Sequence, residues 1–245
     1  MPLGAFYFAL FLISLMSLPE HIAIIPDGNR RWANARLLNP WEGHTEGAKR
    51  FWDVSQELFD MGLNNLTFWA ASYTNLQKRS SLEVKYLINL LKTELSSNRV
   101  LNIALKNNVR IRVIGEWDEI VQDPSLKKAI IDLQDKTKHF VGKTLSLLFA
   151  YDGQREMLSA VESLQKSGEA VSKESLSRNL WTSDLPEVDL VIRTGGEPHW
   201  SAGFMMWHTA NSQLYFTETL WPDFNTEQIK KATEDFDRRE RRLGK

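Results

Sequence analysis

Two short runs of the chain combine arginine and glycine directly after an apolar segment. Asp27 to Arg31 (DGNRR) follow HIAIIP, and Arg193 to Gly196 (RTGG) follow VDLVI. An arginine fork donates two parallel hydrogen bonds to phosphate oxygens, and glycine lets backbone N–H groups approach an anion closely. Asp27 is an acid in a phosphate-binding turn, which indicates a divalent cation between its carboxylate and the phosphates. One such run also fits an ordinary surface turn, whereas the two together predict two phosphorylated ligands side by side.

Composition argues against several other classes of function. The formal charge of −1 is not that of a general nucleic-acid-binding protein. The chain has no cysteine, hence no disulfide or thiolate metal site, which fits a reducing compartment such as the cytoplasm. It has no Walker loop and no G-x-G-x-x-G run, so a nucleotide ligand is not favoured. With 42% hydrophobic residues among 245, we expect one domain with a substantial core.

Apolar runs of about five residues alternate with segments of helical periodicity along the chain. The expected strands cover 22–25, 66–70, 109–114, 144–150, 188–192 and 213–216, and the expected helices include 47–61, 124–140 and 226–243. This alternation predicts a single α/β domain with a central, mostly parallel six-stranded sheet flanked by helices. The stretch 72–75 is expected to be a polar loop, and 167–177 a polar connector.

Polar and charged residues directly follow several of these strands. They are Asp27, Ser72, Asn75, Asp152 and Arg193. Because ligands bind outside the carboxyl ends of strands in parallel sheets, we expect these residues to meet at one edge. An apolar lining of Phe, Trp and Leu between the strand ends would suit a hydrophobic substrate, although Trp41, Trp52 and Trp69 are expected to pack in the core.

The first 18 residues are unlike the rest of the chain. Residues 2–18 carry no charge, lack the basic start of a signal peptide and are marginally short for a spanning helix. We expect an apolar N-terminal helix over 1–18 that packs on the domain or binds a membrane surface, followed by the main domain over 19–245.

From about residue 18 to the end, the chain resembles the cis-prenyltransferase family of undecaprenyl and dehydrodolichyl diphosphate synthases. The resemblance is carried, in order, by HIAIIPDGNRRWA, EGHTEGAKR, LTFWAASYTN, VRIRVIGE, LSLLFAYDGQRE, VDLVIRTGGE, QLYFTETLWPDF and RRERRLG. The amino-acid sequence around PDGNRRWA and NLQKRS resembles that of the archaeal branch. The resemblance implies the undecaprenyl diphosphate synthase-like fold with an apolar tunnel. It also implies condensation of isopentenyl diphosphate with an allylic prenyl diphosphate, dependent on Mg²⁺.

The resemblance also implies roles for individual residues. Asp27 would be the metal-linked acid, and His44, Ser72 and Asn75 would position substrate and assist proton movement. The remaining implied residues bind substrate: Gly28, Asn29, Arg30, Arg31, Trp32, Lys78 and Arg79 on the allylic side, Arg193, His199 and Ser201 on the isopentenyl side, and Arg242 and Gly244 from the carboxy terminus. The last two reach the site at a dimer interface in the family, so a homodimer is expected.

Two departures from the family pattern concern acidic residues. Gln213 stands where the family commonly has a second metal-binding Glu, and a neutral amide is a poorer Mg²⁺ ligand than a carboxylate. Thr74 also stands where Glu is common. The cation would therefore depend more on Asp27 and on the diphosphates themselves.

Two further departures concern arginines. Pro40 stands where Arg is common, and Arg36 could replace it. The segment 198–200 lacks the second Arg usual after Gly-Gly-Glu, and His199 could take its role. These changes leave open an irregular, non-head-to-tail coupling, or prenyl transfer to another acceptor. A non-catalytic subunit of a heteromeric enzyme is a further alternative, but such subunits tend to lose the DGN loop that is intact here.

Overall fold

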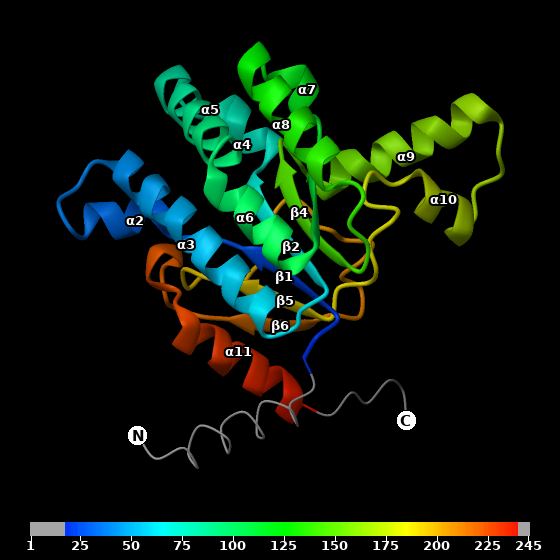
Figure 1. The fold of residues 1–245 in the computed structure, drawn as a ribbon. Helices are drawn as coiled ribbons and strands as arrows, with labels where there is room; N and C mark the ends of the chain where they lie inside the picture. The colour runs from blue at the N-terminus through cyan, green and yellow to red at the C-terminus, as the bar shows by residue number, and fades with distance from the viewer. Residues whose placement is uncertain (1–17, 240–245) are drawn as a thin grey trace.

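The computed structural model describes residues 18–239, and these form one α/β domain (Figure 1). The strands are β1 (His21–Ile25), β2 (Asn65–Ala71), β3 (Val109–Ile114), β4 (Lys143–Phe149), β5 (Leu190–Arg193) and β6 (Gln213–Phe216). They form a six-stranded sheet in the order β3-β4-β2-β1-β5-β6, and every neighbouring pair is parallel. The predicted sheet is confirmed, and it is parallel throughout the described chain. The expected apolar helix over 1–18 falls almost entirely outside the described residues.

The helices follow the strands in the expected alternation. They are α2 (Asn29–Asn34), α3 (Pro40–Asp60), α4 (Tyr73–Lys78), α5 (Ser81–Leu95), α6 (Asn98–Asn107), α7 (Trp117–Ile120), α8 (Pro124–Thr137), α9 (Gly153–Ser167), α10 (Lys173–Asn179) and α11 (Thr226–Arg238), with a 3₁₀ turn η1 (Trp221–Asp223). None of the helices within residues 18–239 combines the length and apolar character needed to cross a bilayer.

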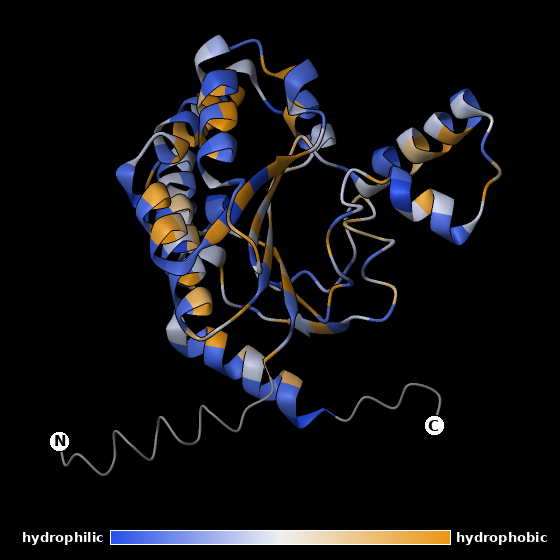
Figure 2. Ribbon diagram, turned by 45° about the vertical axis from the view of Figure 1, so that its right-hand side comes forward, coloured by the Kyte–Doolittle hydropathy of each residue, from blue (hydrophilic) through white to orange (hydrophobic). Residues whose placement is uncertain are grey.

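Alternate residues of β1 pack on opposite faces of the sheet. Ile22 and Ile24 belong to the larger core cluster, which also takes buried residues from α3, α5, α6, α8 and α11. Ala23 and Ile25 belong to the second cluster, formed with Trp69 and the irregular segments around 185–205. This is the period-two alternation of a strand buried on both faces. Figure 2 shows the hydrophobic residues along the strands and on the helix faces turned toward them.

Local signals explain where the helices that carry the site begin. α3 starts at a capping box between Asn39 and Glu42, with Pro40 at its first position. The expected loop at 72–75 is wrong: Ser72 caps α4, because its hydroxyl accepts a hydrogen bond of 2.9 Å from the N–H of Asn75. Ser80 caps α5 in the same manner. The polar connector contains a further helix, α10, whose capping box lies at Ser172.

Candidate active site

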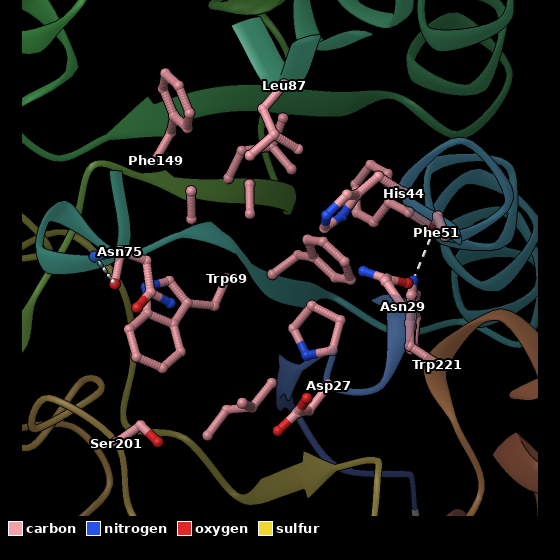
Figure 3. A pocket seen from close by; sticks show the side chains of 18 of the residues that line it. Asp27, Asn29, His44, Phe51, Trp69, Asn75, Leu87, Phe149, Ser201 and Trp221 are labelled. Atoms are coloured by element: carbon pink, nitrogen blue, oxygen red, sulfur yellow. Dashed lines mark hydrogen bonds between the residues drawn. The ribbon is translucent and has the colours of Figure 1, made fainter. Parts of the chain in front are cut away.

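The carboxyl ends of β1, β2 and β5 open into a cavity of about 710 Å³ between α3, α5 and the 199–202 loop (Figure 3). Its polar lining comprises Asp27, Asn29, His44, Ser72, Thr74, Asn75, Arg79, Glu94, Gln154, Arg193, His199 and Ser201. Its apolar lining includes Phe51, Trp52, Phe68, Trp69, Leu87, Leu90, Leu91, Leu147 and Phe149. The cavity therefore joins a polar, charged mouth to a hydrophobic interior. Residues that are far apart in sequence meet here, as expected from their positions after the strands.

Asp27 lies at the mouth and connects the two predicted anion-binding runs. Its Oδ1 accepts a hydrogen bond of 3.1 Å from Arg31, and its Oδ2 accepts one of 3.2 Å from Arg193. Its backbone N–H donates to the Thr194 hydroxyl (2.9 Å), and its carbonyl accepts from the N–H of Trp221 (3.0 Å). The backbone at this acid is thus fixed from two sides, while its side chain stays 37% exposed.

The two runs are in direct contact. Arg31 donates a 2.7 Å hydrogen bond to the carbonyl of Gly195. Gly195 has a φ of +88°, and a Cβ there would lie 2.7 Å from the Arg31 guanidinium and 3.0 Å from the Asp27 carbonyl. Only glycine lets the chain turn this close to Asp27. The two arginine- and glycine-containing runs therefore form one continuous surface at this edge of the sheet.

The amino terminus of α2 lies at the same cavity, since its first residue, Asn29, lines it. Gly28 is the N-cap, no side chain caps the helix, and the first helical hydrogen bond is Trp32 N–H to Gly28 O at 2.8 Å. The N–H groups of Asn29, Arg30 and Arg31 consequently have no acceptor within the helix. Such a terminus stabilises an anion through its N–H groups and through its positive partial charge.

Gly28 is essential to this geometry. Its φ is +111°, and a Cβ would lie 2.7 Å from Leu220 Cδ2. We expect Gly28→Ala to lower the free energy of unfolding by roughly 2–3 kcal/mol, because left-handed strain of about 1–2 kcal/mol adds to the steric overlap. Gly168→Ala is the matched control, since Gly168 also has a positive φ (+72°) but open space around its Cβ position. Urea unfolding measures the stability of both variants. Equal losses of unfolding free energy would contradict the close contact between Gly28 and Leu220.

Arg193 is the most buried charged group of the site, at 4% exposure. One terminal nitrogen donates to the carbonyl of His199 (3.0 Å) and to the Ser201 hydroxyl (2.8 Å), and the other donates to Asp27. Among the described residues, its Nε is a buried donor that lacks an acceptor. Because such a donor is costly to leave unpaired, it is a ready partner for a ligand oxygen.

His44 lies on the other side of the mouth, on α3. Its Nε2 is 3.5 Å from Glu83 Oε1 on α5, and Arg79 donates to the same oxygen at 2.9 Å. Burial, and after it the nearby Arg79 guanidinium, lower the pKa of His44 from 6.5 to about 4, although Glu83 opposes both. The imidazole is therefore neutral at pH 7 and can accept or donate a hydrogen bond without carrying charge.

Protonation of His44 should destabilise the fold in acid. Its pKa in the folded state, about 4, is below its unfolded value of 6.5, so the unfolded chain binds more protons between these values. Stability should fall as pH drops from about 6.5 to 4, by up to about 3 kcal/mol from this group. Buried His21 also has a pKa lowered to about 4, so His44→Gln should remove only part of the loss. Urea unfolding at stepped pH tests this, with exposed His139→Gln as a control that should change nothing.

The α4 helix supplies Asn75 to the cavity, and Arg79, its C-cap residue, also lines it. Its start is held by Asp152, whose Oδ2 accepts hydrogen bonds from the N–H (3.1 Å) and hydroxyl (2.5 Å) of Thr74. Ser72 is 5% exposed and its hydroxyl is used as the helix cap, so its position is structural as well as cavity-lining. Thr74, where the family commonly has Glu, is thus paired with a carboxylate from the end of β4.

Several predicted residues lie outside the cavity. Lys78 is exposed, and the next residue, Arg79, lines the cavity instead. The Trp32 indole donates to Asp223 (2.7 Å), and Arg36 lies over the same indole and pairs with Asp223. None of Lys78, Trp32 and Arg36 lines the cavity, and their roles in substrate binding stay predictions.

Gln213 is also away from the site. It begins β6 and pairs in register with Leu190 at the amino end of β5, whereas Arg193 ends that strand. It lines a separate surface pocket with Glu20 and Arg239. Within one chain it cannot share an ion with Asp27. Arg242 and Gly244 lie outside the described residues, and their roles remain predictions.

Sequence reasoning missed part of the cavity wall. Trp52 and Trp69, assigned to packing, are buried and also line the cavity, as do Glu94 and Gln154. The helical spacing of Phe51 and Trp52 with His44 gave a signal, since residues seven and eight positions apart share a helix face.

The side chains at the mouth could hold a cation only together with a bound substrate that supplies further oxygen ligands. No group of three or more metal-ligating side chains occurs in the described part of the chain. Asp27 offers one carboxylate, already opposed by two guanidinium groups. Mg²⁺ commonly binds through one or two carboxylates plus water and substrate phosphates, and the single exposed Asp27 is compatible with that mode.

Comparisons with known proteins identify the family of this chain. Residues 25–244 match a family model described as "Putative undecaprenyl diphosphate synthase". An isoprenyl transferase of Treponema denticola is 38% identical over 92% of this chain and 97% of that protein. A tritrans,polycis-undecaprenyl-diphosphate synthase (GGDP specific) of Sulfolobus acidocaldarius is 32% identical over 92% of this chain and 88% of that protein. The resemblance to the archaeal branch is not confirmed by these identities.

Solved structures show the same likeness. The lavandulyl diphosphate synthase of Lavandula x intermedia, in complex with dimethylallyl diphosphate, superposes with a TM-score of 0.86 at 26% identity, over 93% of this chain and 99% of that one. A probable undecaprenyl diphosphate synthase of Campylobacter jejuni gives a TM-score of 0.75 at 28% identity, over 94% of this chain and all of that one. Both the family model and the relatives cover nearly the whole chain, which therefore belongs to the cis-prenyltransferase family and is a prenyltransferase.

Proposed function

We propose that this prenyltransferase condenses isopentenyl diphosphate with an allylic prenyl diphosphate to give a polyprenyl diphosphate with new Z double bonds. The observation that carries the proposal is the contact of two anion-binding runs at Asp27, above a cavity of about 710 Å³ with an apolar interior. Two diphosphates need two sets of donors, and a prenyl chain needs a dry, hydrophobic channel.

Each substrate has a matching set of groups. The allylic diphosphate would bind the free N–H groups at the start of α2, with Arg31 and Arg79 nearby. The isopentenyl diphosphate would bind Arg193, Ser201 and His199. In the reaction the allylic C–O bond breaks and diphosphate leaves. The isopentenyl double bond then forms the new C–C bond, and loss of a proton gives the Z alkene.

The protein groups stabilise the charge that develops on the departing diphosphate. Positioned donors at the α2 terminus and the two guanidinium groups act where that negative charge grows. A bound Mg²⁺ would stabilise the same charge as a Lewis acid, held by Asp27 together with phosphate oxygens. Arg31 and Arg193 would then exchange the Asp27 carboxylate for phosphate oxygens.

Labelled isopentenyl diphosphate, Mg²⁺ and allylic primers of several lengths test the proposal with the purified chain. We expect polyprenyl diphosphates with Z double bonds by chromatography and NMR, and loss of product when EDTA removes the metal. A chain that extends none of the primers, alone or with any second subunit, would contradict the proposal.

A second candidate is prenyl transfer to an acceptor other than isopentenyl diphosphate, or irregular coupling. It is favoured by the isopentenyl side of the mouth, where Arg193 is joined by the half-exposed His199. Branched or acceptor-linked products in the same assay would identify this activity.

Assembly and membrane contact are also proposals from the family resemblance. The carboxy-terminal Arg242 and Gly244 would complete the site at a homodimer interface, and residues 1–18 would contact the membrane surface on the cytoplasmic side. Light scattering of the full chain tests the first. Vesicle flotation with and without residues 2–17 tests the second.

A further inference from the structure

Two helices, α3 and α5, form one wall of the cavity and run side by side in the same direction. Three pairs of side chains join them along their length. His44 meets Glu83 (3.5 Å), Thr45 meets Tyr86 (2.5 Å between hydroxyl oxygens), and the Trp52 indole N–H donates to Glu94 Oε2 (2.7 Å). The first two pairs lie at the polar mouth and the third lies deep along the wall.

The space between these pairs is apolar. Gly47, Ala48 and Phe51 line it from α3, and Leu87, Leu90 and Leu91 line it from α5. Ala48 contributes only a methyl group to this wall, whereas Trp52, one turn further along α3, is among the largest fully buried side chains of the described residues. Both Trp52 and Glu94 line the cavity.

The Trp52 ring is held in place. It is 1% exposed, packs 4.4 Å from the Phe51 ring, and has its one polar atom bonded to Glu94 on the opposite helix. A buried indole with its N–H satisfied has little freedom to turn aside, because doing so would leave both the donor and the Glu94 carboxylate without their partner. The carboxylate itself is an unfavourable neighbour for a hydrocarbon chain.

The distance from the mouth to this pair corresponds to a short prenyl chain. Trp52 lies eight positions after His44 and Glu94 lies eleven positions after Glu83, which at 1.5 Å per residue is about 12 to 16 Å along the helices. One prenyl unit adds four main-chain bonds of about 1.5 Å each, hence roughly 5 Å when extended. A chain of about three units would therefore reach Trp52.

We infer that Trp52, held by Glu94, is the wall that limits the prenyl chain, and that its removal lengthens the product. The inference rests on the proposed function and adds the residue pair that sets its specificity. Replacing Trp52 by alanine opens the space between α3 and α5, so the chain can grow past the present limit. Glu94→Ala frees the ring without deleting it and should act in the same direction. Glu94→Gln keeps an acceptor and should retain the wild-type length.

Product length and ligand binding test the inference separately. Chromatography of products should show a longest product at least one prenyl unit longer for Trp52→Ala, and a smaller shift for Glu94→Ala. Equilibrium binding of allylic diphosphates with two to five prenyl units should show affinity rising up to about three units in the wild type and beyond that in Trp52→Ala. Trp117→Ala is the matched control, because Trp117 packs on the core and does not line the cavity.

The two measurements, product length and equilibrium binding, separate failure of the inference from failure of the proposed function. Unchanged product length in folded Trp52→Ala would overturn the inference while leaving the condensation intact. If the wild type forms no prenyl product, the proposed function fails, and the binding profile then decides the role of Trp52. If Trp52→Ala does not fold, Trp52→Leu and Glu94→Ala replace it, and an unchanged length in both overturns the inference.

Discussion

Asp27→Ala should reduce kcat with prenyl substrates by about 10²–10³-fold, the cost of removing one electrostatic group from the transition state. The Asp27 carboxylate is held between Arg31 and Arg193, at 3.1 and 3.2 Å, at the point where the two diphosphate sites meet. Without it, the proposed cation loses its carboxylate ligand, and the Mg²⁺ concentration for half-maximal activity should rise. Steady-state kinetics with a Mg²⁺ titration measures both effects.

The same variant should remain folded. The Asp27 side chain is 37% exposed, and ion pairs of this kind contribute little to stability. Asp27→Asn keeps the shape but not the charge, so it should lose nearly as much activity. Asp223→Ala is the matched control, because Asp223 also pairs with an arginine, Arg36, but outside the cavity. Turnover of Asp27→Ala near the wild-type rate would refute the role of this carboxylate.

The sheet was predictable because each strand is an apolar run with clear ends. The limits of β3 and β6 agree with the expected 109–114 and 213–216, and β1 gains only His21. Parallel order follows from the helices between the strands, and it places Asp27 and Arg193 at one edge. The register confirms this, since Ile25, two residues before Asp27, pairs with Arg193.

Which individual side chains line the cavity depends on three-dimensional geometry that cannot be read from the sequence. Lys78 and Arg79 differ by one position on α4 and its end, yet one is exposed and the other lines the cavity, because successive helical residues point about 100° apart. Gln213 begins the expected strand over 213–216, so the strand pattern already placed it at the amino end of the sheet, whereas the family motif implied a position near the metal. Trp52 looked like an ordinary core residue because a cavity wall and a core have the same composition.

Arg193→Lys should lower kcat/KM by about 10²-fold or more, mostly through a higher KM for isopentenyl diphosphate. The Arg193 fork reaches the His199 carbonyl, the Ser201 hydroxyl and Asp27 at once, and keeps Nε for a ligand. A lysine ammonium keeps the charge but cannot span these positions or bind two phosphate oxygens in parallel. Losing two charge-assisted hydrogen bonds, at about 1.5–3 kcal/mol each, accounts for an effect of this size.

The split between the two substrates makes the Arg193 prediction specific. KM for the allylic primer should change little, because the N–H groups of α2 and Arg31 on that side are untouched. Arg112→Lys is the matched control: Arg112 is also largely buried and pairs with Asp184, but it lies on β3 outside the cavity. Thermal unfolding of both variants separates a binding defect from loss of the fold. Equal increases in KM for both substrates would place Arg193 in a general structural role, whereas a selective increase assigns the isopentenyl diphosphate to its side of Asp27.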